Sequence, residues 1–418
     1  MAQQRPTSKL DRHIVISADG HAFGAGNGLM DTSHLAALTD YFEARYRSAY
    51  LDSVHVLERE VQERMARILG GLFDTRAPRS FAEQAAAISP GTRGLSDSQC
   101  RLDELEQDGI VAEVLFPNGA PFGHGFGGPV YPPELRAAGA RAYNRWLIDF
   151  CQAAPGRRAG MAIVTLHDIQ QAVSDVEAAK AAGLKGVLLP GYWATEGIPP
   201  YLDPYYEPFW SACADAGMPL NLHGGASIGD VDMKQYGMPA MLTYATETTF
   251  LSTRALTQLI WGGVFERHPN MVLILTESRA DWVPSRLAFL DGVYEDQLFA
   301  HVKDTVKHKP SEYWHRQCYV VASFMSRDEA LLRHKIGLDR LLWGADYPHY
   351  EGTWPHTDLW LKETFGGLPT NEVRTILAEN PARIFGFDLD KLRRHATTKG
   401  PLVEEIEAHE PSGTLRRW

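Results

Sequence analysis

The sequence has few of the features that mark secreted or membrane-bound proteins. Its four cysteines are scattered over 418 residues without a CxxC pair, which excludes a disulfide-rich secreted module. The first twelve residues lack the apolar run of a signal peptide, and no stretch reaches the roughly 18 apolar residues of a membrane span. These absences predict a cytoplasmic protein with reduced thiols.

Positive charge is also in deficit, and the formal net charge is -11. Phosphate backbones and anionic lipids are held by clustered lysine and arginine, so neither nucleic acid nor a membrane is an expected partner. The 44% apolar and 22% charged residues are ordinary globular usage, which argues against disorder. A small-molecule substrate is the expected partner, and a homodimer is compatible with the sequence, which does not itself show one.

Short apolar or β-branched runs alternate with amphipathic segments such as 169–184 and 203–218, each of which ends at a glycine before the next run. This alternation predicts a parallel sheet, and eight runs are the number of a (β/α)8 TIM barrel. A doubly wound α/β sheet would show the same alternation and stays open at this point. The predicted strands are 13–18, 111–116, 160–166, 186–190, 219–223, 272–277, 319–323 and 341–346.

We expect one catalytic barrel domain over residues 13–388. Residues 22–109 are too long for a simple crossover and contain a helical stretch, so they are predicted to form a cap over the barrel mouth. The alternative is a helical insertion that only buttresses the barrel or a subunit contact. Residues 389–418 are charged and lack a strand signal, so we expect a C-terminal tail that wraps or extends.

Four side chains at the ends of predicted strands form a candidate metal site. Asp19 and His21 close the first strand two residues apart, His223 ends the fifth and Asp346 ends the eighth. Because active sites of such barrels lie at the carboxyl ends of the strands, these side chains are expected to meet. Each has an ordinary alternative, such as Asp-Gly turn chemistry or a hydrogen-bonded core histidine. Together, two imidazoles and two carboxylates suit Zn²⁺, Mn²⁺ or Fe²⁺.

Several phrases between residues 14 and 388 occur in an order typical of one family. They are DGIVAEVLFPN, YNRWLIDFC, GRRAGMAIV, GLKGVLLP, FERHPNMVLILTESRADWVP, WGADYPHYEGTWP and ENPARIFGFD. With these phrases the chain resembles the amidohydrolase-related (amidohydrolase 2) family of the amidohydrolase superfamily. That family contains metal-dependent hydrolases and decarboxylases, including aminocarboxymuconate semialdehyde decarboxylase and γ-resorcylate decarboxylase.

The resemblance implies a ligand set for this chain. Asp19 occupies the first position of a motif that is HxH in many members and ExH in resorcylate-type decarboxylases. His21, His223 and Asp346 match the remaining ligands, and Asp346 is also expected to accept a proton from the metal-bound water. No lysine stands at the end of the fourth strand, where binuclear members carry a carbamylated bridge. One divalent ion is therefore expected, with Zn²⁺ first and Mn²⁺ or Fe²⁺ as alternatives.

The sixth strand departs from the best-studied members, because Glu277 stands where they have a histidine. We expect Glu277 and His349 to share general acid and base catalysis with Asp346, the alternative for Glu277 being an ion pair with Arg279. The side chains expected to contact substrate are Arg279, Trp354 and His356. Solvated loop positions are the alternative for His349 and His356.

The reaction stays open between three chemistries. Hydrolysis by a metal-bound water is placed slightly ahead of non-oxidative decarboxylation of a small aromatic or carboxylated molecule. Dehydrative closure of a benzoxazole-type ring, known among family relatives, is the third. An inactive barrel that serves as a binding scaffold is a fourth alternative, disfavoured because all four ligand positions hold competent donors.

Overall fold

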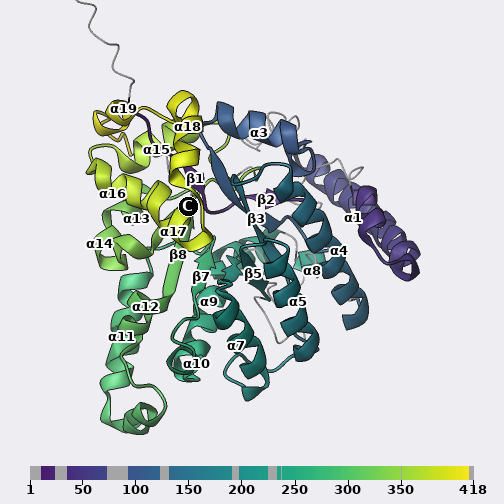
Figure 1. The fold of residues 1–418 in the computed structure, drawn as a ribbon, viewed down its shortest axis with the longest axis horizontal. Coiled ribbons are helices and arrows are strands. Elements are labelled where there is room, and N and C mark those ends of the chain that lie inside the picture. The colour runs from purple at the N-terminus through teal and green to yellow at the C-terminus, as the bar shows by residue number, and fades with distance from the viewer. Residues whose placement is uncertain are drawn as a thin grey trace, which may run out of the picture.

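The computed structural model describes residues 11–23, 35–72, 93–122, 131–190, 197–224, 233–236, 238–349 and 351–413. A parallel sheet surrounded by helices forms the centre of the molecule (Figure 1). The strands run in the order β1-β3-β4-β5-β6-β7-β8-β9, and β2 also pairs with β3. Their bounds are β1 Ile16–Ser17, β2 His21–Ala22, β3 Ala112–Pro117, β4 Arg158–Ile163, β5 Gly186–Leu189, β6 Leu220–His223, β7 Leu273–Thr276, β8 Cys318–Ser323 and β9 Leu341–Gly344.

The first and last strands meet and close the sheet. The backbone N–H of Ala18 donates to the carbonyl of Trp343 at 2.9 Å, and that of Asp346 donates to Asp19 at 3.0 Å. Local periodicity cannot distinguish this closure from an open doubly wound sheet, because both folds alternate strands and helices along the sequence. The predicted (β/α)8 TIM barrel is therefore confirmed, and the doubly wound alternative is wrong.

The predicted strands differ from the observed ones by up to three residues at either end. Glu277 and Asp346, predicted as the last residues of two strands, have φ of 53° and 59°. Left-handed backbone leaves the pleated ladder, so β7 ends at Thr276 and β9 ends at Gly344. Such backbone is costly for residues with a side chain and collects at functional sites.

Helices follow most strands, and capping residues mark where several of these helices begin or end. Asp168 accepts a hydrogen bond from the Gln171 N–H and caps α5, while left-handed Gly217 ends α7. The long helices are α1 Arg47–Leu72, α3 Ser98–Gln107, α4 Pro133–Gln152, α5 Ile169–Ala181, α7 Glu207–Ala216, α9 Met238–Trp261, α11 Val283–Glu295, α12 Pro310–Gln317, α15 Thr357–Phe365 and α18 Leu389–Lys399.

The described residues also form shorter helical segments. The α-helical ones are α8 Met233–Tyr236, α10 Val264–Arg267, α13 Arg327–Leu331, α14 Arg333–Ile336, α16 Thr370–Arg374, α17 Asn380–Phe385 and α19 Val403–Glu407. The tighter or wider turns are η1 Leu35–Tyr41, η2 Ala44–Tyr46, η4 Pro204–Tyr206, η6 Gln297–Asp304, η7 Leu338–Arg340 and η8 Thr375–Glu379. None of the helices in the described ranges is long and apolar enough to cross a membrane.

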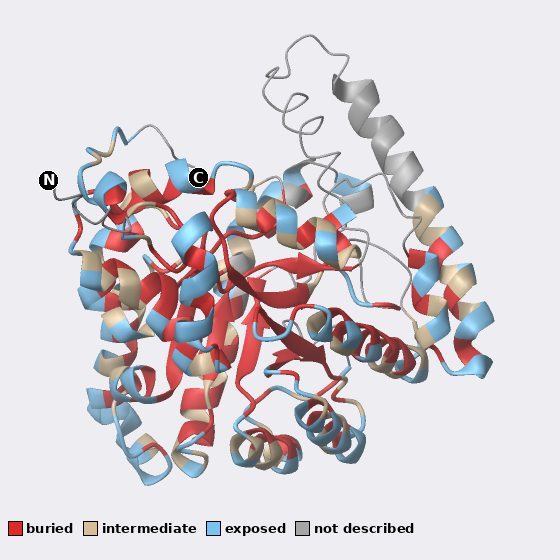
Figure 2. Ribbon diagram, turned by 45° about the horizontal axis from the view of Figure 1, so that its top comes forward, coloured by how far each residue is buried: buried red, intermediate tan, exposed pale blue. Residues whose placement is uncertain are grey.

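The strands are buried on both faces (Figure 2). Along β8, Val320 and Ala322 pack with the surrounding helices, whereas Tyr319 and Val321 pack inside the barrel. This period of two is the side-chain alternation of a strand. It explains why the strands appear in the sequence as nearly continuous apolar runs.

The insertion predicted over residues 22–109 contains η1, η2, α1 and α3, while its residues 24–34 and 73–92 lie outside the described part. The η1 segment packs on α4, where the Tyr41 hydroxyl donates to Asp149 at 2.9 Å. Helix α1 lies at the flank of the molecule beyond α4 (Figure 1). A capping role for this insertion stays a prediction.

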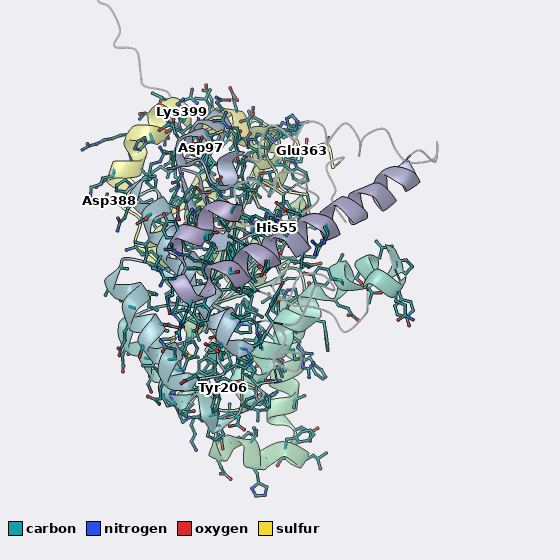
Figure 3. The ribbon with its side chains drawn as sticks, turned by 90° about the vertical axis from the view of Figure 1, so that its right-hand side faces the viewer. His55, Asp97, Tyr206, Glu363, Asp388 and Lys399 are labelled. Atoms are coloured by element: carbon teal, nitrogen blue, oxygen red, sulfur yellow. The ribbon has the colours of Figure 1, made fainter. Side chains whose placement is uncertain are left out.

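The segment predicted as a C-terminal tail is folded up to Glu407. Asp388 caps α18 by accepting the Lys391 N–H, and Figure 3 labels Asp388 and Lys399 at the two ends of this helix. Ala396 of α18 and Ile406 of α19 are buried. The apolar residues of this part recur at helical spacing and pack against the rest of the molecule. Residues 414–418 lie outside the described part.

Candidate metal centre

The four predicted ligands meet at the carboxyl ends of the strands. Asp19 lies between β1 and β2, His21 begins β2, His223 ends β6 and Asp346 follows β9. All parallel strands of a barrel point the same way, so residues distant in sequence converge at one mouth. The exposed fraction of each ligand side chain is 5% or less.

The donor atoms are close enough to share one ion. His21 Nε2 lies 3.1 Å from Asp346 Oδ1 and 3.6 Å from Asp19 Oδ1. His223 Nε2 lies 3.1 Å from the same oxygen of Asp19. Ligand atoms of Asp19, His21 and His223 all fall within 4.8 Å of one another.

The hydrogen bonds around the ligands fit a cation. His21 Nδ1 lies 3.2 Å from the carbonyl oxygen of Pro117, so Nδ1 donates and Nε2 presents a lone pair to Asp346. Both carboxylate oxygens of Asp346 are buried, and Oδ1 faces two imidazole nitrogens, His21 Nε2 at 3.1 Å and His349 Nδ1 at 3.0 Å. Buried acceptors that face one another are costly unless a positive charge lies between them. Two imidazoles and two carboxylates therefore fit a divalent metal ion, and they accept Zn²⁺, Mn²⁺ or Fe²⁺.

Neighbouring side chains orient the ligands. The Ser323 hydroxyl at the end of β8 donates to Asp19 Oδ2, which leaves Oδ1 directed at the two histidines. Gly344 passes so close that a Cβ there would lie 2.5 Å from the Cβ of Asp19. Such outer contacts fix ligand geometry in metal sites.

Protonation of the histidines agrees with a cation site. Burial lowers the pKa of His21, and the neighbouring His349 lowers it further, which favours the neutral imidazole that binds metals. Burial alone would lower the pKa of His223, but the carboxylates of Asp19, Glu277 and Asp346 together raise it. Either a proton on His223 or a bound metal ion would offset the negative charge of these carboxylates.

Glu277 borders the ligands from the end of β7. Its Oε2 lies 3.3 Å from His223 Nδ1, and burial raises its pKa to about 8. Arg279, proposed as its alternative partner, instead forms an ion pair with Asp281 at 3.2 Å and is partly exposed. The carboxyl group of Glu277 thus lies at the metal pocket.

His349 is buried beside the ligands, contrary to the alternative of a solvated loop residue. Its ring stacks on that of His21, and its Nδ1 lies 3.0 Å from Asp346 Oδ1. Burial lowers the pKa of His349, but Asp346 outweighs this effect and brings it to about 10. Two residues absent from the sequence-based site also lie here: Asn118 contacts His349 Nε2 at 2.7 Å, and Glu351 lies 4.0 Å from its Nδ1. Asn118 closely follows a predicted strand, which was the available signal.

Comparison with known proteins agrees with this geometry. Residues 101–387 match the amidohydrolase family. The chain belongs to the amidohydrolase family. This amidohydrolase is 23% identical over 257 residues to 2-amino-3-carboxymuconate-6-semialdehyde decarboxylase of Dictyostelium discoideum, an alignment that covers 60% of this chain and 67% of the relative.

Solved structures share the fold of this amidohydrolase. The 5-carboxyvanillate decarboxylase of Sphingomonas paucimobilis is 20% identical with a TM-score of 0.62, covering 90% of this chain and 100% of that one. A dihydroxybenzoic acid decarboxylase of Polaromonas sp. JS666, solved with manganese and 2-nitroresorcinol, is 17% identical with a TM-score of 0.61, covering 90% and 97%. These likenesses support the barrel assignment independently of the strand pairing.

The remaining predicted residues of the amidohydrolase lie around the pocket or outside it. Trp354 packs edge-on against the ring of Tyr347, the neighbour of Asp346, with centroids 5.4 Å apart. His356 is exposed and precedes the first turn of α15. Contact of Arg279, Trp354 and His356 with substrate stays a prediction.

Proposed function

We propose that this amidohydrolase is a metal-dependent non-oxidative decarboxylase of a small aromatic or carboxylated acid. The observation that carries the proposal is the place of Glu277, whose carboxyl group lies 3.3 Å from His223 beside the metal ligands. Glu277 stands where the best-studied members of the family have a histidine, and its carboxyl group can exchange a proton in place of that imidazole.

Similarity to known proteins supports the same choice over hydrolysis. The curated relative and several structures of similar fold are decarboxylases of carboxylated substrates. The DxH pair also resembles the carboxylate-containing motif of resorcylate-type decarboxylases. Hydrolysis, placed slightly ahead from the sequence, uses the same ligands and becomes the competing outcome.

The roles of the residues follow from their positions. Asp19, His21, His223 and Asp346 would hold the ion, which when bound supplies a Lewis acid for substrate oxygen atoms. Loss of carbon dioxide requires that a proton reach the carbon that loses the carboxyl group. Glu277 borders the ligands from the His223 side and His349 from the Asp346 side, so each offers a buried proton carrier there.

The proposal also covers the identity of the metal ion, the cellular location of the protein and its oligomeric state. The donor set accepts both Zn²⁺, our first expectation, and Mn²⁺, which two decarboxylase structures of similar fold contain. One ion per chain is expected, with a small molecule as the partner. A cytoplasmic location and a homodimer remain predictions.

The test is product analysis on a panel of hydroxybenzoates, anilides and carboxylated semialdehydes with metal-loaded protein in ¹⁸O-labelled water. Decarboxylation predicts carbon dioxide and a product of matching lower mass without incorporated ¹⁸O. Incorporation of ¹⁸O without carbon dioxide would establish hydrolysis instead, and loss of water alone would indicate ring closure. The Asp346→Asn variant is the inactive control.

A further inference from the structure

A buried arginine outside the metal site contacts one of the ligand strands. Arg101 lies on α3 with an exposed fraction of 0%. Its Nε and Nη2 donate to the two carboxylate oxygens of Glu113 on β3, at 2.7 and 2.6 Å. Its Nη1 donates to the backbone carbonyl of His21 at 2.6 Å and to that of Gly94 at 3.2 Å. One guanidinium thus joins α3, β3 and the segment that carries a metal ligand.

The same guanidinium also contacts the second ligand segment. Its Cζ lies 4.6 Å from the centroid of the Tyr347 ring, and Tyr347 directly follows Asp346. The Tyr347 hydroxyl donates to Glu104, one turn further along α3. Arg101 therefore links the backbone of one ligand to the neighbour of another.

Arg101 and Glu113 approach the backbone closely at Gly20, which lies between the ligands Asp19 and His21. A Cβ at Gly20 would lie 3.1 Å from Arg101 Nη2 and 3.2 Å from Glu113 Oε2. Strand β2 has only two residues, so few sheet hydrogen bonds hold His21 in place. The Arg101–Glu113 ion pair thus packs directly on the backbone of Gly20, beside the short strand that carries His21.

We propose that Arg101 is a positioning residue of the metal centre, fixing His21 through its carbonyl group and Asp346 through the ring of Tyr347. Glu113 neutralises the guanidinium and holds it in the fork geometry that these contacts need. The assignment depends on the metal centre and not on the reaction that the enzyme catalyses.

Arg158 provides a matched control within the same network. It has an exposed fraction of 5%, and its Nε lies 3.4 Å from the same carboxylate of Glu113. Its other hydrogen bonds in the described structure go to Ser98 and to the Phe150 carbonyl. Arg158 thus shares the burial and the ion pair of Arg101 without these links to the metal ligands.

The test compares Arg101→Lys with Arg158→Lys. Lysine keeps the charge but has no fork, so it cannot hold Glu113, the His21 carbonyl and the Tyr347 ring together. We expect Arg101→Lys to weaken metal affinity by about 10- to 100-fold and Arg158→Lys to leave it nearly unchanged. Affinity is measured by competition with a chelator, and the visible spectrum of the Co²⁺-loaded protein reports ligand geometry. That spectrum should change in Arg101→Lys only.

Equal metal affinity and an equal Co²⁺ spectrum in the two folded variants would overturn the proposal. If Arg101→Lys fails to fold, Arg101→Met removes the guanidinium while Glu113 keeps its ion pair with Arg158, so no buried carboxylate is left uncompensated. The same loss of affinity is expected there, and parental affinity in Arg101→Met would equally refute the assignment. Because no substrate is present, absence of decarboxylation would not alter this result.

Discussion

The imidazole rings of His21 and His349 stack with their centroids 4.0 Å apart and their planes 16° apart. His21 is a predicted metal ligand at the start of β2, whereas His349 belongs to the loop after the last strand, β9. The stack brings His349 Nδ1 to 3.0 Å from Asp346 Oδ1. An ionisable group that is not itself a predicted ligand therefore lies in direct contact with two of the predicted metal ligands.

The variants His223→Ala and Asp346→Asn should fold and lose the bound metal. Each removes one donor from a buried set of four, and a site that loses a charged or lone-pair donor binds a divalent ion far more weakly. Elemental analysis of the purified proteins measures the loss, and circular dichroism checks the fold. His356→Ala, altered at an exposed position, should keep the parental metal content. Retention of metal by both ligand variants would refute the assigned site.

Glu277→Gln should lower kcat by about 100-fold while the metal content stays at the parental level. Glutamine keeps the size and most of the hydrogen bonding of the side chain but cannot exchange a proton. Steady-state kinetics on the substrate identified by product analysis measures the effect. Asp281→Asn, which removes a carboxylate paired with Arg279 on the same loop, is the control and should keep its activity. Parental activity in Glu277→Gln would show that another group moves the proton.

Gly344→Ala should weaken metal binding from a position that carries no ligand. An added Cβ would lie 2.5 Å from the Cβ of Asp19, so Asp19 must move away from the histidines. Chelator competition measures the change, for which we expect about a tenfold loss of affinity. Gly292→Ala on α11 is the control, because a Cβ there meets nothing within 4 Å. The prediction fails if the two alanine variants bind metal equally well.

Asp108→Asn should change how stability depends on pH. Burial raises the pKa of Asp108 to about 7, while the Thr357 N–H that it accepts lowers it and Asp358 adds to the rise. Between about pH 4 and 7, Asp108 keeps its proton in the folded chain but has lost it in the unfolded chain. The contribution of Asp108 to the free energy of unfolding therefore falls as pH rises through that window. Asparagine keeps the acceptor for Thr357 and carries no charge.

The stability of Asp108→Asn relative to the parent should therefore increase from pH 5 to pH 8, by on the order of 2 kcal/mol. Urea unfolding of both proteins at several pH values measures the difference, which cancels the titration of groups common to both. A difference that stays constant over this range would mean that Asp108 is ionised throughout in the folded chain.

Part of the candidate site could be predicted because it depends on local order. Asp19, His21, His223 and Asp346 each stand at the end of an apolar run, and parallel strands bring such ends to one mouth. Glu277 was identified for the same reason. By contrast, Asn118 and Glu351 contact His349 only after the loops fold over the mouth. Asn118 follows a predicted strand, but the residues around Glu351 carry no periodic signal.

The sequence by itself determined the alternation of strands and helices, the eight strand positions around the barrel and the four candidate ligand positions, because side-chain periodicity and turn residues act over a few positions at a time. Tertiary structure alone decided that β1 meets β9, that Arg279 turns to Asp281, and that Arg101 of α3 packs against β3 and contacts His21. These contacts join residues far apart in the chain, and their energy depends on burial and distance in the folded state. No local pattern of residues encodes that energy.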